Sequence, residues 1–333
     1  MTKLDEFIQE LCPDGVKYLP IPELFITRNG YTPSKANNEF WENGTIPWFR
    51  MEDIRENGRI LTTATQYVSE KAVKGKLFPA DSIIIATSAT IGEHALIKVP
   101  SLANQRFTYL TLKDEFKDCV DMMFVFYYCF RLDEYCKSHL NQGNFASVDM
   151  KQFAAFKFPV PPLPVQCEIV RILDNFTELT AELTAELTAR KQQYAYYRDK
   201  LLTFGDVRGG ATSDVVWKTL AEIADISTGS SNTDDAVKGG CYPFFVRSQQ
   251  LLAKDEYEYD EEAIITAGDG VGVGNVFHYI NGKYALHQRA YRIHPATDGL
   301  LGKYLYHYFV ATFPKYIGQQ MYQGSVPSIR RPM

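Results

Sequence analysis

Several features that would assign a chain to a definite class are missing from these 333 residues. No apolar run approaches the ~18 residues that a membrane-spanning helix needs. The N-terminal segment MTKLDEFIQELCPDG is polar and lacks the apolar core of a signal peptide. The six cysteines are scattered, and none forms a C-x2-C pair with metal-ligand spacing. We therefore expect a cytosolic protein without a metal site, in which Cys129 and Cys136 are buried thiols.

An excess of positive charge is also missing, because the net charge is −5. A protein that binds nucleic acid without sequence preference relies on bulk positive charge, so this class is disfavoured. A protein with local basic patches, or one that borrows charge from a partner, remains open.

Catalytic signatures are absent as well. The sequence has no N-P-P-[YF] motif, which an adenine methyltransferase needs to hold its target base, no Walker lysine loop and no H-E-x-x-H. The segment GDGVGVGN lacks the spacing of a phosphate-binding loop. Carboxylate pairs such as Asp234 and Asp235 lie in polar loops without a basic companion. We expect no catalytic residue in this chain.

The most regular stretch runs from Pro164 to Phe204 and predicts one long helix. Apolar or large residues recur there in steps of three and four, so one seam stays on one face. The seam residues that we expect to meet a partner are Ile172, Phe176, Leu179, Leu183, Leu187, Tyr194 and Tyr197. The helix contains a tandem four-residue repeat, TEL-TAEL-TAEL-TA. A rod of ~40 residues, near 60 Å long, needs a packing partner because helix propensity alone supplies little stability.

The segment before this helix predicts short strands and two helices. A short amphipathic helix fits the first fifteen residues, and a buried strand fits Ile83 to Ile85. The segment NQRFTYLTL at 104–112 shows strand alternation. A second helix fits residues 118–140, with the inward positions Val120, Met123, Phe124, Tyr127 and Tyr128.

The first part of the chain recurs, in weaker form, after the long helix. Residues 80–92 correspond to 260–272, NQR at 104–106 to HQR at 287–289, and QGNFASV at 142–148 to QGSVPSI at 323–329. Ordered matches of this kind predict an internal duplication.

The predicted fold class is therefore α+β, with two similar strand-rich domains joined by a long α-helical spacer in a pseudo-twofold arrangement. We expect the first domain over 1–157, the spacer over 158–205 and the second domain over 206–333. The second copy ends at SIRRPM, so a second spacer helix is expected to be absent. A shortened expression product, a naturally short gene and a helix supplied by another chain all remain open.

Two similar domains on a rod form a ruler with a reader at each end. Duplex DNA suits such a ruler, because one face of its major groove recurs every ~34 Å. The two readers differ in sequence, so we expect an asymmetric site with two unlike half-sites and an unread spacer.

The segment FPVPPLPVQCEIVRILDNFTELTAELTAELTARKQQYAYYRDKLLTF closely resembles the central conserved region of type I restriction-modification specificity subunits. The PPLPVQ-x-x-IV-x-ILD segment, the YYRDKLL ending and the TAEL repeat carry the resemblance, which covers the whole chain. It implies that each variable domain is a target recognition domain and that the helix is the spacer between them. The number of TAEL units is associated in this family with spacer length.

The same resemblance implies partners. Two methyltransferase subunits dock on the helices of such proteins, and restriction subunits complete the complex. S-adenosylmethionine, ATP and Mg²⁺ are expected on those partner subunits, and no cofactor in this chain.

Specificity is expected in the length-variable loops and at the polar residues that recur in both copies. In the first domain the candidate DNA contacts are Arg28, Asn29, Tyr31, Thr32, Lys35, Arg50, Ser88, Thr90, Gln105, Arg106 and Asn144. In the second domain they are Ser227, Thr228, Ser230, Asn232, Arg247, Ser248, Gln249, Gln288, Arg289 and Ser325.

Two interpretations without base recognition compete with these assignments. The NQR and HQR segments recur in domains that should read different sequences, which favours a structural or backbone-positioning role over base reading. The two domains could also be interaction modules on a coiled-coil scaffold that binds no DNA.

Overall fold

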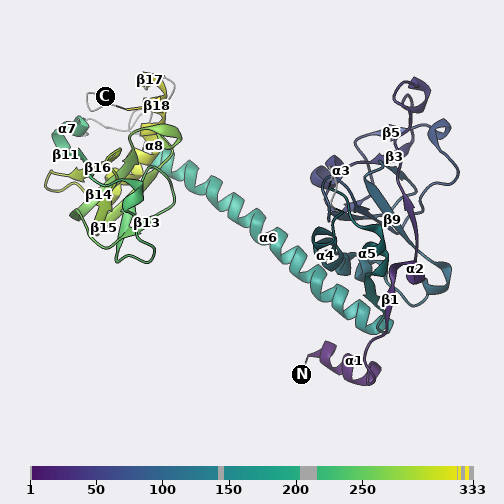
Figure 1. Cartoon of the computed structure of the whole chain (residues 1–333). Helices are drawn as coiled ribbons and strands as arrows, with labels where there is room; N and C mark the ends of the chain where they lie inside the picture. Colours follow the sequence, from purple (N-terminus) through teal and green to yellow (C-terminus); the bar gives the residue numbers. More distant parts are fainter. Residues whose placement is uncertain (1, 142–145, 203–215, 321, 324–326, 330–333) are drawn as a thin grey trace. The chain divides into compact units, whose positions relative to one another are not determined.

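The structure is a computed structural model of the whole chain, and it describes residues 2–141, 146–202, 216–320, 322–323 and 327–329. The chain divides into two compact units, Met1–Leu183 and Thr184–Met333. The division falls within one continuous helix, α6, which spans Leu163–Leu202 (Figure 1). In the part of the chain that is described, no helix is long and apolar enough to cross a membrane.

Short strands and a few helices build the first unit. Its helices are α1 Lys3–Leu11, α2 Ile21–Leu24, α3 Met51–Asn57, α4 Met122–Ser138 and α5 Met150–Ala155, followed by the first part of α6. Its strands are β1 Tyr18–Pro20, β2 Phe25–Asn29, β3 Ile46–Phe49, β4 Ile60–Leu61, β5 Tyr67–Val68, β6 Ser82–Ala86, β7 His94–Ile97, β8 Leu102–Ala103, β9 Phe107–Leu112 and β10 Lys157–Pro159.

The second unit has the same character. Besides the end of α6, its helices are α7 Leu220–Ile223 and α8 Gly302–Gln320. Its strands are β11 Ala224–Thr228, β12 Tyr242–Phe245, β13 Leu252–Lys254, β14 Tyr259–Ala267, β15 Phe277–Leu286, β16 Ala290–Pro295, β17 Tyr322–Gln323 and β18 Pro327–Ser328.

The predicted helix in the first fifteen residues is present as α1. Thr2 and Asp5 form a capping box at its start, in which the Asp5 amide donates to the Thr2 hydroxyl at 3.2 Å. The apolar face of α1 is only partly covered, since Leu4, Phe7 and Leu11 are half-buried and none of the helix residues is fully buried.

The main sheet of the first unit has the strand order β2-β9-β6-β7-β4 and is covered on both faces. Ile83 and Ile85 of β6 point into one hydrophobic cluster, and Ile84 and Ala86 point into another. All five residues of β6 are therefore buried, as predicted for this strand. The alternation read into 104–112 was wrong, because β9 is likewise buried on both faces and only Thr111 within it is half-buried.

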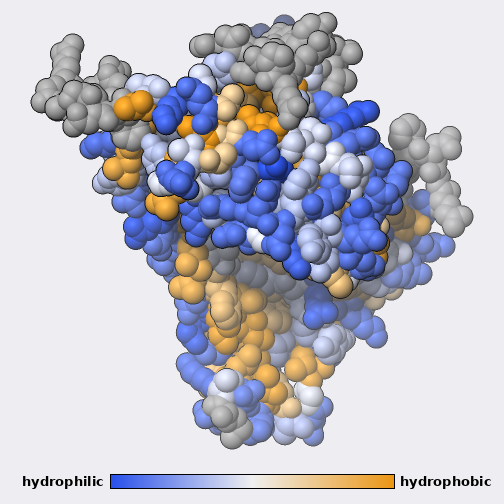
Figure 2. All heavy atoms as spheres, turned by 90° about the vertical axis from the view of Figure 1, so that its left-hand side faces the viewer, coloured by the Kyte–Doolittle hydropathy of each residue, from blue (hydrophilic) through white to orange (hydrophobic). Residues whose placement is uncertain are grey.

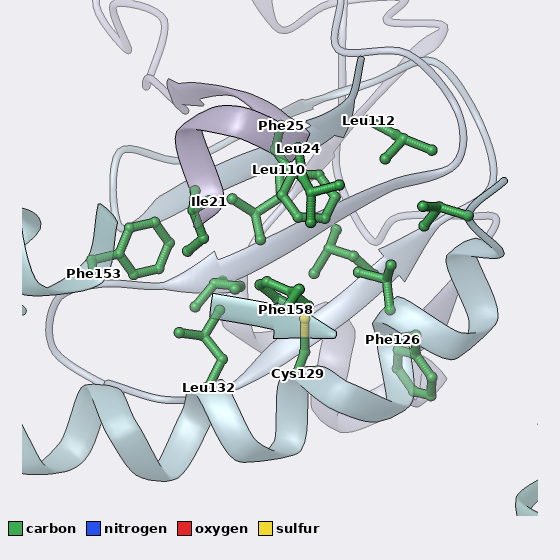
Figure 3. Packing of buried hydrophobic residues seen from close by; sticks show 14 of the residues in the cluster. Ile21, Leu24, Phe25, Leu110, Leu112, Phe126, Cys129, Leu132, Phe153 and Phe158 are labelled. Atoms are coloured by element: carbon green, nitrogen blue, oxygen red, sulfur yellow. The ribbon is translucent and has the colours of Figure 1, made fainter. Parts of the chain in front are cut away.

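Helix α4 covers one of these faces. Figure 3 shows Phe126, Cys129 and Leu132 of α4 beneath the strands, near Phe158. The predicted inward positions are confirmed in part. Phe124 is buried, and the buried Val120 precedes the helix. Met123, Tyr127 and Tyr128 are half-buried and pack against this cluster.

Cys129 and Cys136 are buried, as predicted. Burial raises the pKa of the Cys136 thiol to about 12 and that of Cys129 well above its ordinary value. Both groups therefore stay protonated and pack as small apolar side chains.

Replacing Leu132 with alanine is expected to destabilise the first unit by about 2–5 kcal/mol, because the fully buried side chain leaves a cavity. Urea unfolding followed by circular dichroism measures the change. Leu140→Ala is the matched control at a side chain that is 43% exposed, and it is expected to change stability by less than about 0.5 kcal/mol. Equal losses in the two variants would contradict this placement of α4.

The second unit repeats the sheet of the first. Its order β11-β16-β14-β15 corresponds strand by strand to β2-β9-β6-β7. The parallel pair β12–β15, with Phe244 opposite Ala285, corresponds to β3–β8, with Trp48 opposite Leu102. Helix α8 packs Leu305 and Phe309 against the sheet, as α4 does in the first unit. The prediction of two similar strand-rich domains and a long helix is confirmed, whereas the predicted boundaries stay predictions.

Gln166 fixes the start of α6 to the first unit. Its side chain is fully buried and donates to the carbonyls of Pro161 at 2.6 Å and Cys119 at 2.8 Å. Its side-chain oxygen accepts from the amide of Asp121 at 2.8 Å. About two turns further along α6, the Tyr127 hydroxyl donates to Asp174. The glutamine of the PPLPVQ segment is therefore a structural anchor, because a smaller apolar residue would leave these buried groups unpaired.

Candidate nucleic-acid interface

In each unit, three loops meet at one end of the main sheet. The first loop follows β2 or β11, and the second follows β6 or β14. The third is the turn that precedes β9 or β16. The amide of Thr87 donates to the carbonyl of Arg106 at 2.9 Å, and the amide of Gly268 donates to that of Arg289 at 2.9 Å. The same backbone frame thus carries the NQR and HQR segments in both units.

The first residue of each segment has a structural role. The Asn104 side chain accepts the amide of Arg106 at 3.0 Å, and Nδ1 of His287 accepts the amide of Arg289 at 3.0 Å. The second residue reaches the variable loop, since Gln105 pairs with Thr32 and Gln288 pairs with Asn232. The third residue, Arg106 or Arg289, is exposed. The segments therefore combine a shared turn with an exposed arginine.

The second unit gathers several predicted residues around a hollow of about 480 Å³. Its lining residues are Asn232, Thr233, Asp234, Asp235, Arg247, His287, Gln288 and Arg289. Asp269 joins two of them. Its carboxylate oxygens accept from Nη1 of Arg247 at 2.7 Å and from Nη1 of Arg289 at 3.3 Å.

His287 lies beneath this hollow and is 4% exposed. Burial lowers the pKa of its imidazole, and the charge of Arg247 lowers it further. The ring is therefore neutral at physiological pH, which suits Nδ1 as an acceptor for the Arg289 amide.

Three predicted residues of the first unit have polar atoms that bond to other parts of the same unit, although Arg28 and Asn29 are exposed. Arg28 donates to the carbonyl of Lys76 at 3.0 Å and lies 4.1 Å from the ring centre of Phe78. Asn29 accepts from the Thr108 hydroxyl at 2.9 Å. The Tyr31 hydroxyl accepts the amide of Lys74 at 2.7 Å and donates to the carbonyl of Ala72 at 3.1 Å. These contacts favour structural roles for the three side chains.

The remaining predicted residues of the first unit are spread over its surface. Lys35 is exposed, and Thr32 is half-buried. Arg50 is half-buried and donates to Thr65 at 2.9 Å. Ser88 and Thr90 are half-buried in the loop after β6.

In the second unit, Thr228, Ser230, Ser248 and Gln249 are exposed, and Ser227 is half-buried. The amide of Ser230 donates to Glu258 at 2.9 Å. Gln249 donates to the carbonyl of Asn275 at 2.9 Å. Asn144 and Ser325 lie outside the described residues, so their predicted roles are not tested.

Sequence reasoning missed Asp269 and misread the acidic loop before β12. Asp234 and Asp235 do have basic companions, because they line the same hollow as Arg247 and Arg289. The alignment of the two copies was also one residue off. Ser88 bridges to Ser147 and Asp269 bridges to Ser328, so Ser88 corresponds to Asp269 and not to Gly268. A shift by one residue at the end of 80–92 could have shown this.

Among the described residues, no group of three or more His, Cys, Asp and Glu side chains is placed to hold a metal.

The predicted seam of α6 is uncovered along most of its length. The exposed fractions are 64% for Phe176, 55% for Leu179, 62% for Leu183, 55% for Leu187, 55% for Tyr194 and 50% for Tyr197. Ile172 is half-buried near the anchored end, and Tyr194 shares a hydrogen bond of 3.1 Å with His307 of α8. Exposed hydrophobic residues are also visible as orange patches on the face drawn in Figure 2.

Comparison with known proteins assigns the class. Residues 13–190 and 212–330 match the family described as "Type I restriction modification DNA specificity domain". The chain therefore belongs to the family of type I restriction-modification specificity subunits, as the resemblance indicated. These subunits are non-catalytic, and the catalytic activities of such systems lie on other subunits. In type I complexes, specificity subunits partner with methyltransferase subunits, restriction subunits and DNA.

Two relatives from Escherichia coli are similar over long stretches. The type I restriction enzyme EcoprrI specificity subunit is 50% identical over 284 residues, which cover 79% of this chain and 69% of that protein. The EcoR124I/EcoR124II specificity subunit is 36% identical over 201 residues, which cover 57% of this chain and 48% of that protein. This chain thus spans about two thirds of the first relative and about half of the second.

Solved structures share the fold. The S subunit of a type I restriction-modification system from M. genitalium matches with a TM-score of 0.56 and 14% identity, covering 92% of this chain and 79% of that one. A chain from a structural study of complex assembly and conformational transition of the type I system matches with a TM-score of 0.59 and 16% identity, covering 96% and 84%. These likenesses support the α+β fold with its long central helix.

Proposed function

We propose that this chain recognises an asymmetric, bipartite site on double-stranded DNA and orients methyltransferase subunits on it. The observation that carries the proposal is the duplication. Two units that share the order of four sheet strands carry the same arginine on one backbone frame, Arg106 or Arg289, beside an unlike residue, Ser88 in the first unit and Asp269 in the second. A shared backbone that carries different loop residues is the arrangement expected of two domains that recognise different half-sites.

Helix α6 is the spacer in this proposal, and the TAEL repeat sets its length. Each added unit of four residues lengthens a helix by ~6 Å and turns it by ~40°. The threonines fit this role, since Thr177, Thr180 and Thr188 donate to the carbonyl four residues earlier and face no other element through those bonds.

The partners in the proposal are two methyltransferase subunits and the restriction subunits, all in the cytoplasm. S-adenosylmethionine would bind to the methyltransferase, and ATP and Mg²⁺ to the restriction subunits. The net charge of −5 supports a role for such partners, because this chain brings no bulk positive charge of its own to the DNA.

The uncovered seam of α6 supports a further part of the proposal, self-association or pairing with a helix of a partner. Leu179, Leu183 and Leu187 are more than half exposed, and apolar side chains in such a row gain most by burial against a second helix.

The predicted DNA contacts stay part of the proposal. Lys35 and Arg106 fit best, because both are basic and exposed, and Arg289 is exposed while it pairs with Asp269. Arg28 and Asn29 are exposed too, but they and Tyr31 fit less well, because their polar atoms are bonded within the first unit.

The rival is a scaffold that holds two interaction modules and binds no DNA. Fluorescence anisotropy separates the two, with the chain in complex with its methyltransferase partner and a DNA that carries the motif methylated in the host. We expect binding about 10³-fold or more tighter than to a scrambled site, and weaker at higher salt. Absence of binding to any DNA, even with the partner, would leave the scaffold as the function.

A further inference from the structure

We propose that Asp269 is a positioning residue that presents Arg247 and Arg289 to a guanine·cytosine base pair in the half-site read by the second unit. The inference rests on the proposed function, since it takes this unit to lie against DNA. It adds to that function a specificity determinant and the chemistry of the base that it reads.

The geometry is that of a shared carboxylate. Asp269 lies in the loop two residues after the end of β14, and its backbone pairs with Ser328. One carboxylate oxygen holds Arg247 and the other holds Arg289, at 2.7 and 3.3 Å. The Asp269 side chain is 21% exposed, whereas those of Arg247 and Arg289 are 38% and 59% exposed. Two long side chains are therefore held in place before any ligand arrives, and less of their rotamer freedom is lost on binding.

The charge balance favours a base edge over a phosphate. Asp234, Asp235 and Asp269 lie in or beside the hollow with Arg247 and Arg289, so the formal charges do not add up to a positive site. A phosphate gains little there. A guanidinium has five N–H donors, and one of those on Arg289 is taken by Asp269. Others can donate to O6 and N7 of guanine, the commonest specific contact of arginine in the major groove.

Comparison of the two units shows which of these contacts belong to the shared fold and which are specific to the second unit. The turn made by Asn104 in one unit and His287 in the other is present in both, as a fold requirement should be. The carboxylate is not, because Ser88 occupies the place of Asp269 in the first unit. A feature that differs between two copies of one frame is what a determinant of half-site sequence must be.

The test uses the full complex with the methyltransferase partner and a panel of DNA duplexes in which each base pair of the host-methylated motif is replaced in turn. The variants are Arg289→Ala, Arg289→Lys, Asp269→Asn and Asp269→Ser, the last of which introduces the residue of the first unit. Asp298→Asn removes a carboxylate from an exposed site elsewhere in the second unit and serves as the control.

We expect Arg289→Ala to lower discrimination at one G·C pair of one half-site by about 10- to 100-fold. Arg289→Lys keeps the charge but loses the paired N–H donors of the guanidinium. It is therefore expected to lose the same discrimination, with unchanged affinity for scrambled DNA. Both Asp269 variants should relax the same base pair, by a smaller factor. Discrimination at the other half-site and the dependence of affinity on salt should not change. The control variant should discriminate as the wild type does.

Two results would overturn the proposal. Equal weakening on every duplex, with a salt slope smaller by ~1, would show a phosphate contact. Unchanged discrimination at every base pair would show that the cluster does not face the DNA. Failure of the proposed function is distinguishable from both, because the wild-type complex would then bind no duplex of the panel with sequence preference.

Discussion

Deleting residues 184–187, one TAEL unit, is expected to move the two half-sites of the recognised DNA closer together without altering either. The deletion shortens α6 by ~6 Å and rotates its far end by ~40°. A base pair advances the duplex by ~3.4 Å and twists it by ~35°. The rotation corresponds to one base pair and the rise to at most two, so the unread spacer should shorten by about one base pair. Methylome sequencing of a strain that carries the deletion measures the motif directly.

The effect on binding should be large, because the wrong spacing allows only one half-site to be engaged at a time. Affinity for the original site is expected to fall towards the non-specific level, about 10³-fold or more weaker. Thr184→Ala, which keeps the length of the helix, is the control and should leave the motif unchanged. A changed base within either half-site of the deletion strain would refute the role of the repeat as a spacer.

The double variant Leu183→Glu and Leu187→Glu is expected to abolish pairing of the α6 seam with a second helix. The two side chains are 62% and 55% exposed in this chain. Burying a leucine is worth about 1.5–3 kcal/mol, so losing two weakens association by about 10²- to 10⁴-fold, and two charges in an apolar seam weaken it further. Sedimentation analysis of the chain, alone and with the methyltransferase partner, measures the change.

Glu182→Gln is the control for this experiment, because residue 182 lies beside the seam and is exposed. It should leave association unchanged. The helix itself should persist in the double variant, since glutamate is a good helix former, and circular dichroism checks this point. A wild-type chain that stays monomeric at high concentration and gains no helix from its partner would rule out the pairing.

Local pattern was sufficient for much of the fold. The helix predicted from Pro164 to Phe204 is present over Leu163–Leu202, and residues 203–204 lie outside the described part. A long run with steps of three and four and no internal glycine has few alternatives. The strand at Ile83 to Ile85 was equally clear, because a short β-branched apolar run suits a buried strand.

The site was harder to predict, because it depends on contacts between distant segments. Arg28, Asn29 and Tyr31 were expected at the DNA, yet their polar atoms bind Lys76, Thr108 and the 72–74 backbone. The sequence does not show whether a polar side chain in a loop bonds to a DNA base or to a carbonyl of the same protein. Only strand pairing decides which segments face it.

Sequence by itself determined the duplicated strand-rich architecture, the long helix with its uncovered seam and the family, because periodicity and repeated motifs are local properties of the chain. Tertiary structure alone decided that Asp269 joins Arg247 and Arg289, which stand 22 and 20 residues away from it. The register of β14 against β16 brings Ala267 opposite Ala290 and so sets the loop after β14 beside the turn that precedes β16. A shift of one residue in that register would move Asp269 away from Arg289, and the spacing of the two residues along the chain does not reveal the register.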